Sequence, residues 1–241
     1  MKAVVMSFCG YDTPIHDLTH MVAPGNILQG AYHLAAALPN LPEGSVTLAV
    51  IDPDVGGSRN GMAALFRGRF VVAPDNGLVS LLYGALKAWK LPPADESVSP
   101  TFHGRDVFAP CAARLVIDPG WTEFLAPLEN PVKLGGLKPV CSINSVQTNV
   151  LHVDHFGNCI LGLCPHDLLG FFPEVIMSRD IEIPLHTVLS YCMSKSDKSV
   201  LFLMGSQGFF ELGINKGHAA EVLGLSAGDR ITIKGKWIGS E

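Results

Sequence analysis

The first half of the chain alternates compact apolar runs with longer amphipathic stretches. Residues 45–51 and 70–73 are short runs rich in β-branched residues and bounded by turn-formers, which is typical of buried strands. Other stretches repeat their apolar residues at spacings of three and four, which predicts helices. These helices are expected over residues 26–39, 77–89 and 107–116.

The ends of the predicted helices carry matching signals. Asn26 is suited to cap the first helix, and Pro39 to end it. Pro110 is tolerated only in the first turn of the third helix. Because strands and helices alternate, we expect an α/β domain with a mainly parallel sheet over residues 1–136.

After about residue 135 the pattern changes to short strand-like runs separated by turns. The segment PVKLGGLKP (131–139) has the composition of a linker. The runs that follow it lie within residues 149–163, 175–185, 199–205, 209–215 and 230–237. They predict a smaller, all-β domain over residues 145–241, built as a barrel or a sandwich.

Composition and charge narrow the class of protein. Of 241 residues, 48% are hydrophobic and 16% are charged, which favours a folded chain with ample core. A net charge of −5 without a basic cluster argues against a nucleic-acid partner. The six cysteines form no C-x-x-C pair, which favours buried reduced thiols. No apolar run reaches the roughly 18 residues of a membrane span, so we expect a cytoplasmic protein that does not contact membranes.

Polar clusters interrupt the apolar pattern at four places and are the candidate sites. In VIDPDVGGSR (50–59), Asp52 follows a strand, where α/β sheets gather ligands. TFHGRD (101–106) precedes a helix start, which favours anions. The other two clusters are HVDHFGN (152–158) and MGSQGFFELGIN (204–215). Each also has a purely structural explanation, as a turn, a helix cap or a hairpin.

Metal binding is the weakest of the chemical alternatives. Two short segments contain ligand types, and their candidate residues are His16, Asp17, His20, His152, Asp154 and His155. His16 and His20 are four residues apart, so their side chains would lie on one face only if this segment were a helix. The neighbouring residues favour an extended conformation instead. No H-E-x-x-H motif is present. We therefore expect no metal.

Taken together, six segments resemble, in their order and spacing, the family of S-adenosyl-L-methionine (SAM) hydroxide adenosyltransferases. These enzymes are also called SAM hydrolases and are related to fluorinase and chlorinase. The segments are LTHMVAPGNI (18–27), VIDPDVGGSR (50–59), APDNGL (73–78), TFHGRDVFAP (101–110), VDHFGN (153–158) and GSQGFFELGIN (205–215).

This resemblance implies a reaction and an assembly. Water displaces methionine at the ribose C5′ of SAM, which gives adenosine and L-methionine without a cofactor. Asp52, Arg59 and His103 would hold the water as the catalytic residues. The halogenases are similar but carry tyrosine at the positions of Asp52 and His103, so the residues here favour the hydrolase. The family fold implies a homotrimer with sites between neighbouring subunits.

The resemblance also assigns the substrate pocket. Asp154 would bind the methionine ammonium group and Ser206 its carboxylate. Phe102 and Gly104, on either side of His103, would line the same pocket.

The adenine base would be held by the second half of the chain. Asn158 would form a hydrogen bond with adenine, and Phe156 and Tyr191 would be its aromatic walls. The backbone around Asn215 would complete the contact with the adenine edge.

The chain departs from the family pattern in three ways. The family's first strand and its TDFG turn, whose aspartate binds the ribose hydroxyls, have no counterpart before MKAVV. Asp54 stands where the family has glycine, and Asn26 where aspartate is common. A glycine often marks a positive φ, so Asp54 is expected to reshape the loop or to add charge beside Asp52. The missing ribose-binding aspartate keeps a non-catalytic SAM or adenosine binder open as an alternative.

Overall fold

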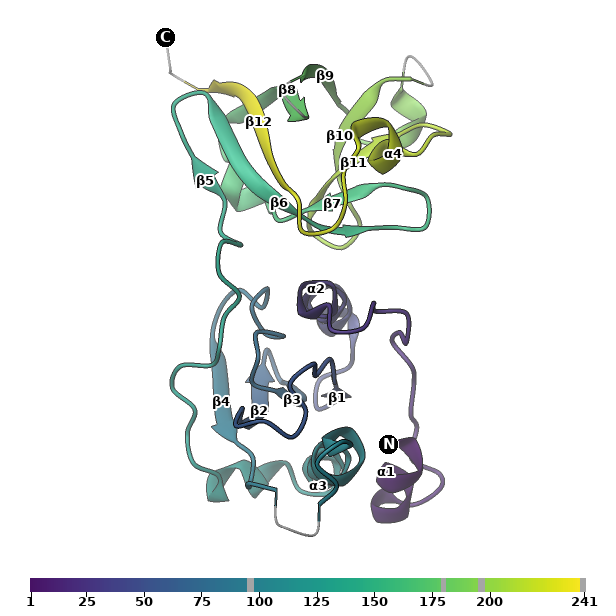
Figure 1. Cartoon of the computed structure of the whole chain (residues 1–241), viewed down its shortest axis with the longest axis vertical. Coiled ribbons are helices and arrows are strands. Elements are labelled where there is room, and N and C mark those ends of the chain that lie inside the picture. Colours follow the sequence, from purple (N-terminus) through teal and green to yellow (C-terminus); the bar gives the residue numbers. More distant parts are fainter. Residues whose placement is uncertain (95–97, 179–180, 195–197, 239–241) are drawn as a thin grey trace. The chain divides into compact units, whose positions relative to one another are not determined.

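The computed structural model describes residues 1–94, 98–178, 181–194 and 198–238, and the chain divides into two compact units (Figure 1). The units are Met1–Leu134 and Gly135–Glu241. Each is described by itself below.

The first unit contains a four-stranded sheet in the order β1-β3-β2-β4. Its strands are β1 (Val46–Leu48), β2 (Gly61–Phe66), β3 (Arg69–Pro74) and β4 (Leu86–Lys90). Only β1 and β3 are parallel, whereas β2 pairs antiparallel with both β3 and β4. The expected mainly parallel sheet is therefore wrong, although the mixed α/β class is correct.

Two local features explain the antiparallel pairs. Arg67 and Gly68 join β2 to β3 with φ values of 48° and 76°, the left-handed conformations of a tight hairpin turn. The helix expected over residues 77–89 does not form, because Gly77 and Gly84 take φ values of 107° and 122°, which no helix accommodates. The second part of that segment is strand β4 instead.

Helices lie on both faces of this sheet (Figure 1). The helical elements of the unit are α1 (Lys2–Cys9), α2 (Ile27–Ala37), η1 (Leu38–Asn40), the π-helical turn η2 (Gly104–Phe108), α3 (Ala109–Ile117) and η3 (Pro119–Phe124). The expected Asn26 cap is confirmed, because its Oδ1 accepts a hydrogen bond from the Gln29 N–H at 2.9 Å. Pro110 lies in the first turn of α3, as expected. Helix α1 was not expected, and it packs on α3.

The two faces of β2 and β3 are buried against different helices, so nearly every residue of these strands is apolar. Met62 and Ala64 pack with Leu34 of α2, whereas Ala63 and Val72 pack on the α3 side. Because both faces are buried, these strands are continuous apolar runs in the sequence rather than an alternation of apolar and polar residues.

The second unit is a closed barrel of seven strands, which confirms the barrel of the two expected forms. Its order is β12-β8-β9-β10-β11-β7-β6, and β12 pairs again with β6 to close the ring. Strands β9 and β10 are parallel, and the other neighbours are antiparallel. The strands are β5 (Val140–Cys141, paired outside the ring with β6), β6 (Ser145–Val153), β7 (Cys159–Leu161), β8 (Phe171–Ser178), β9 (Ile181–Thr187), β10 (Val200–Met204), β11 (Phe210–Ile214) and β12 (Arg230–Trp237).

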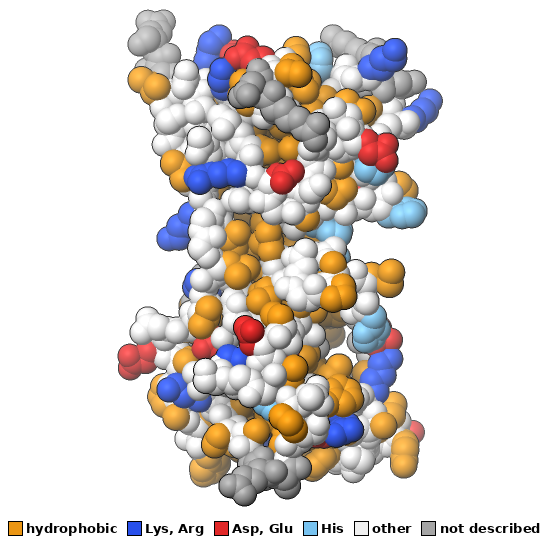
Figure 2. Space-filling model, viewed as in Figure 1, with side chains coloured by type: hydrophobic (Ala, Val, Ile, Leu, Met, Phe, Trp, Pro, Cys, Tyr) orange, Lys and Arg blue, Asp and Glu red, His pale blue; other side chains and the backbone are white. Residues whose placement is uncertain are grey.

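Among the described residues of this unit, three short helices lie beside the barrel strands, and the barrel core is aliphatic and aromatic. The helices are η4 (Pro165–Leu168), η5 (Tyr191–Met193) and α4 (Ala219–Leu223). Leu161, Phe202 and Leu212 are almost completely buried in the core. No helix in the described ranges is both long and apolar enough to cross a membrane. On the face drawn in Figure 2, the Lys and Arg side chains are dispersed among acidic and uncharged ones.

The expectation that the cysteines are buried, reduced thiols is confirmed only in part. All six cysteines are free, and Cys159 is buried, but Cys141 and Cys192 are exposed. Cys141 lies on the short strand β5 and Cys192 on η5, which are both peripheral elements.

We predict that iodoacetamide at neutral pH modifies Cys141 and Cys192 and spares Cys159. Burial raises the pKa of Cys159 to about 12, so its reactive thiolate is scarce as well as shielded. Peptide mass spectrometry after timed alkylation measures this order. Rapid modification of Cys159 in the native protein, at the rate seen in denaturant, would contradict the barrel core.

We also predict that Gly30→Ala lowers the free energy of unfolding by about 1–3 kcal/mol. A Cβ at Gly30 would lie 2.7 Å from Ile51 Cγ1 and 2.8 Å from Leu78 Cδ2, where α2 crosses the sheet. Urea denaturation measures the change. Gly135→Ala is the matched control, because a Cβ there meets nothing within 4 Å. Equal stability of the two variants would refute this close packing.

Candidate active site

Three polar side chains that are far apart in the sequence meet in the first unit. Asp52 follows β1, Arg59 precedes β2, and His103 precedes η2. The Arg59 Nε donates to Asp52 Oδ1 at 2.8 Å, and its Nη2 donates to the other oxygen, so the pair is bidentate. The same Nη2 lies 3.0 Å from His103 Nδ1. The structure therefore brings together all three residues expected to be catalytic.

This cluster is largely withdrawn from solvent. The side chains of Asp52 and Arg59 are 5% and 12% exposed, and His103 is 8% exposed. The Arg59 guanidinium also lies over the ring of Phe108, 5.1 Å from its centroid. A buried ion pair with hydrogen bonds on both partners is rigid, because leaving either charge unpaired would be costly.

The geometry fixes the tautomer of His103. A guanidinium only donates hydrogen bonds, so Nδ1 of His103 must be the acceptor. In the neutral imidazole the proton then resides on Nε2. His103 can thus present its Nε2–H as a donor beside the Asp52 carboxylate, which is an acceptor. A water molecule between them could accept a hydrogen bond from His103 and donate one to Asp52.

A turn over residues 75–77 positions the loop on which Asp52 and Arg59 lie. The Asn76 Nδ2 donates to the carbonyl of Ile51 at 2.8 Å, next to Asp52. The Asp75 N–H donates to the carbonyl of Asn60 at 2.9 Å, next to Arg59. The APDNGL motif therefore supports the site by binding the backbone beside Asp52 and Arg59. Its composition alone predicts only a turn.

Asp54 does not strain this loop. Among the described residues other than glycine, only Arg67 and Lys216 have a positive φ, so Asp54 occupies an ordinary conformation. The position that requires glycine is Gly56, with a φ of 81° and a Cβ position 2.5 Å from the carbonyl oxygen of Pro100. The Asp54 side chain is exposed, and its effect on the shape of the loop or on the charge beside Asp52 stays a prediction.

The rest of the TFHGRD motif faces elsewhere. Phe102 is 44% exposed, and the Arg105 guanidinium lies 5.0 Å from the centre of its ring. Arg105 and Asp106 pair with each other, with Nη2 to Oδ2 at 2.8 Å. Gly104 is buried, and a Cβ there would lie 3.0 Å from the Met1 sulfur. Only His103 of this motif joins the Asp52 cluster.

A second group of predicted residues meets on the barrel unit, in the loop before β7. The Asp154 Oδ1 accepts hydrogen bonds from the Phe156 and Asn158 N–H groups, each at 2.9 Å. Its Oδ2 accepts one from Asn158 Nδ2, also at 2.9 Å. Gly157 closes the loop with a φ of 85°, against the ring of His218. Asp154 therefore holds this loop and the side chain of Asn158.

Tyr191 joins this group through a residue that the sequence did not single out. Its hydroxyl donates to Glu211 Oε1 at 2.5 Å, and its ring lies over Gly213, where a Cβ would be 2.5 Å away. The same Cβ would lie 3.0 Å from Asn158 Oδ1. Glu211 is the one acidic residue in the apolar run FFELGIN, and this isolated charge is the signal that could have identified it.

Burial changes the ionisation of this pair. It raises the pKa of Tyr191 far above its usual range, and the hydrogen bond to Glu211 acts in the same direction. Burial also raises the pKa of Glu211, and the nearby Asp154 charge raises it further. The hydrogen bond from Tyr191 lowers this pKa and opposes both influences. Tyr191 is therefore a neutral donor at any physiological pH.

The remaining predicted pocket residues are more exposed. Ser206 lies in the turn between β10 and β11, which is closed by the Gly205 N–H donating to the Phe209 carbonyl at 2.8 Å. Phe156 is 74% exposed, and Asn215 is half-buried at the end of β11. These three residues border the Asp154 and Glu211 group in sequence, and Phe156 is joined to it through its N–H, which donates to Asp154.

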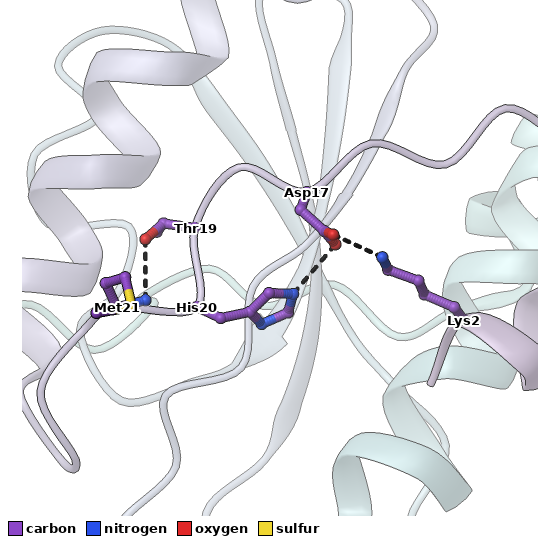
Figure 3. Close-up of polar contacts among 5 residues, drawn as sticks. All are labelled: Lys2, Asp17, Thr19, His20 and Met21. Carbon is purple, nitrogen blue, oxygen red and sulfur yellow. Dashed lines mark hydrogen bonds and ion pairs between the residues drawn. The ribbon is translucent and has the colours of Figure 1, made fainter.

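His20 and Asp17, two of the residues considered as metal ligands, form a hydrogen bond with each other. Figure 3 shows Asp17 between Lys2 and His20, with hydrogen bonds of 2.6 Å to Lys2 Nζ and 3.1 Å to His20 Nε2. The hydrogen bond from Lys2, and then that from His20, lowers the pKa of Asp17. The segment around His16 and His20 is not helical. This network ties the loop before α2 to α1.

One group of possible metal ligands occurs in the part of the chain that the structure describes. Ligand atoms of Cys164, His166 and Asp167 lie within 4.8 Å of one another. However, Asp167 Oδ2 already accepts the Cys164 N–H at 2.8 Å, and burial raises the pKa of the Cys164 thiol to about 11. These contacts are the helix cap of η4, which accounts for the cluster without an ion.

Models of one protein family match both units of the chain. The N-terminal domain of SAM hydroxide adenosyltransferase matches residues 1–124, and its C-terminal domain matches residues 148–232.

Individual relatives are similar over most of the chain. An (R)-S-adenosyl-L-methionine hydrolase of Thermus thermophilus is 36% identical over 236 residues, which covers 88% of this chain and 84% of the relative. A protein of the same name from Salinispora tropica is 36% identical over 233 residues, covering 92% and 86%. A fluorinase of Nocardia brasiliensis is 25% identical over 280 residues, covering 97% and 90%.

Solved structures agree with the fold. An uncharacterized conserved protein from Thermotoga maritima superposes with a TM-score of 0.85 at 30% identity, covering 97% of this chain and 93% of that one. A conserved hypothetical protein from Thermus thermophilus gives a TM-score of 0.74 at 32% identity, covering 96% and 93%. With both of its units matched, and with relatives above 30% identity along most of its length, the chain belongs to the SAM hydroxide adenosyltransferase family, to which fluorinase is related.

Proposed function

We propose that the protein hydrolyses S-adenosyl-L-methionine by attack of water at the ribose C5′, which gives adenosine and L-methionine. The observation that carries this proposal is the buried cluster of Asp52, Arg59 and His103. Relatives named as (R)-S-adenosyl-L-methionine hydrolases, 36% identical to this chain, support it.

The cluster is suited to hold one water molecule in line with the C5′–S bond. The Asp52 carboxylate accepts a hydrogen bond from the water, and the His103 Nε2–H donates one to its oxygen. Arg59 holds Asp52 with two hydrogen bonds and balances its charge. Both groups at the water are thereby fixed before substrate arrives, which is the preorganisation that such a reaction needs.

The reaction needs little more than this positioning. The new C5′–O bond forms as the C5′–S bond breaks, and the electron pair goes to sulfur, so methionine leaves as a neutral thioether without an acid. Free hydroxide at neutral pH would cost roughly 12 kcal/mol from water of pKa ~15.7. Asp52 therefore takes the proton late, as charge develops on the oxygen. Orientation of the reactants contributes up to roughly 7–11 kcal/mol.

In this proposal the two units have different tasks. Residues 1–136 form the catalytic domain, and residues 145–241 supply the pocket for the rest of the substrate. Asn158 and Tyr191 bind adenine, together with Phe156 and the backbone at Asn215. Phe102, Gly104, Ser206 and Asp154 line the methionine end. The active form is a homotrimer with its sites between subunits, and a cytoplasmic location remains a prediction from the sequence.

A non-catalytic SAM or adenosine binder is the second candidate. Incubation with SAM and chromatography for adenosine separates the two functions, because a binder releases no adenosine while calorimetry still detects binding. A halogenase, the third candidate, would instead give 5′-halo-adenosine in chloride or fluoride.

We predict that Asp52→Asn and His103→Ala each lower the rate of adenosine release by at least about 100-fold while SAM still binds. Each removes one of the two groups that fix the water, but neither contacts the adenine. Chromatographic rate assays and calorimetry measure the two effects.

The matched control for Asp52→Asn is Asp54→Asn, which removes an exposed carboxylate two residues away. Its rate should stay within about two-fold of wild type, equivalent to less than about 0.5 kcal/mol in the barrier. Full turnover by Asp52→Asn would reject the assignment, as would an equal loss in the Asp54→Asn control.

A further inference from the structure

The loop before β7, which carries Asn158, is held from outside by the start of helix α4. The Ala220 N–H donates to the carbonyl of Gly157 in this loop at 2.9 Å. The imidazole ring of His218 lies against the same glycine, because a Cβ on Gly157 would be 2.5 Å from its Cδ2 and closer still to its Cγ and Nδ1. The ring therefore occupies the space that any other residue at position 157 would need.

The ring of His218 is itself fixed in place. Its Nδ1 accepts the Glu221 N–H at 3.2 Å, which makes His218 the N-cap of α4. Because an N–H group only donates, the proton of the neutral ring resides on Nε2, which lies 3.8 Å from Glu221 Oε1. Ala219 and Ala220 are buried in the barrel core. The start of α4 thus cannot move away from the loop without opening that core.

Gly157 is the residue of the loop that gains most from an outside support. Its φ is 85°, and a residue without Cβ has the greatest backbone freedom of all. Its own N–H donates to the carbonyl of Asp154 at 3.0 Å, and it directly precedes Asn158. The His218 ring restricts this glycine as a side chain would, but without the strain that a side chain suffers at positive φ.

His218 also connects the two segments of the barrel unit that the proposed function assigns to adenine. The first is the loop at Gly157 and Asn158. The second is the end of β11 at Asn215, from which the chain reaches His218 through a turn with a hydrogen bond of 3.0 Å from the Gly217 N–H. The spacing of the two segments therefore depends on the contact between the ring and Gly157.

We infer that His218 is a positioning residue for the substrate: its ring holds Gly157 and thereby keeps Asn158 in the orientation that binds adenine. The inference rests on the proposed function, because it concerns the adenine side of the same site. It requires that the effect of His218 falls on binding and not on the chemical step at Asp52.

The test compares wild type, His218→Asn and the control His166→Ala, by the kinetics of SAM hydrolysis and by calorimetry with adenosine. Asparagine is among the best N-cap residues, so His218→Asn keeps an acceptor for the Glu221 N–H and should fold, but it lacks the ring. His166 lies in η4, beyond the other end of β7, and its side chain is 66% exposed.

His218→Asn should raise the KM for SAM and the Kd for adenosine about 10-fold each, as expected if the ordered loop is populated about a tenth of the time. Its kcat should stay within about two-fold of wild type. A merely structural role would instead lower kcat, through a smaller folded fraction, and leave KM unchanged. His166→Ala should change none of these constants. Unchanged KM and Kd in His218→Asn, or a fall in kcat alone, would overturn the inference.

A double-mutant cycle keeps the test decisive if His218→Asn does not fold. Gly157→Ala should weaken adenosine binding at least about five-fold more in wild type than in the His218→Ala background, because the added methyl group meets the ring only where the ring is present. The strain of alanine at a φ of 85° is common to both backgrounds and cancels. Equal weakening in the two backgrounds would overturn the inference.

Failure of the proposed function gives a different result. Wild type that binds SAM without releasing adenosine would refute the hydrolysis alone, because the adenosine affinities still test His218. Wild type that binds neither ligand would overturn both proposals. Failure of the inference alone leaves wild type active and the His218 variants equal to it.

Discussion

The two hydrogen bonds from Arg59 to Asp52 are the interaction on which the rest of the first unit depends. They join the end of β1 to the start of β2, and the same guanidinium reaches His103 at the start of η2. Because arginine keeps its proton at any physiological pH, it fixes both the charge of the cluster and the tautomer of the histidine. Three loops that would otherwise be independent are thereby held around one point.

The surrounding fold makes this cluster possible. The sheet is buried on one face by α2 and on the other by α3, so its strand ends cannot shift without disturbing two cores. The turn at Asp75 and Asn76 then ties the residues beside Asp52 and Arg59. Phe108, fully buried, supports the guanidinium with the face of its ring. Rigidity at the polar cluster is thus a consequence of packing as well as of charge.

Local patterns in the sequence predicted what depends on local chemistry. The Asn26 cap, the place of Pro110 and most barrel strands follow from neighbouring residues, and the ordered motifs pointed to the Asp52 cluster. The sheet direction could not be predicted in the same way, because it depends on the left-handed turn at Arg67 and Gly68 and on where β4 pairs. Glu211 was missed for a related reason: one acidic residue in an apolar run gains meaning only when Tyr191 is seen to contact it.

If the Asp52 cluster directs water to a carbon of the ribose, the oxygen of that water must end in the product. Turnover of SAM in water enriched with oxygen-18, followed by mass spectrometry of the adenosine, tests this claim most directly. We predict one heavy oxygen in each adenosine, located in its 5′-hydroxyl group, since the new bond joins water oxygen to C5′. Adenosine without the label, or no adenosine at all from folded protein that binds SAM, would contradict the claim.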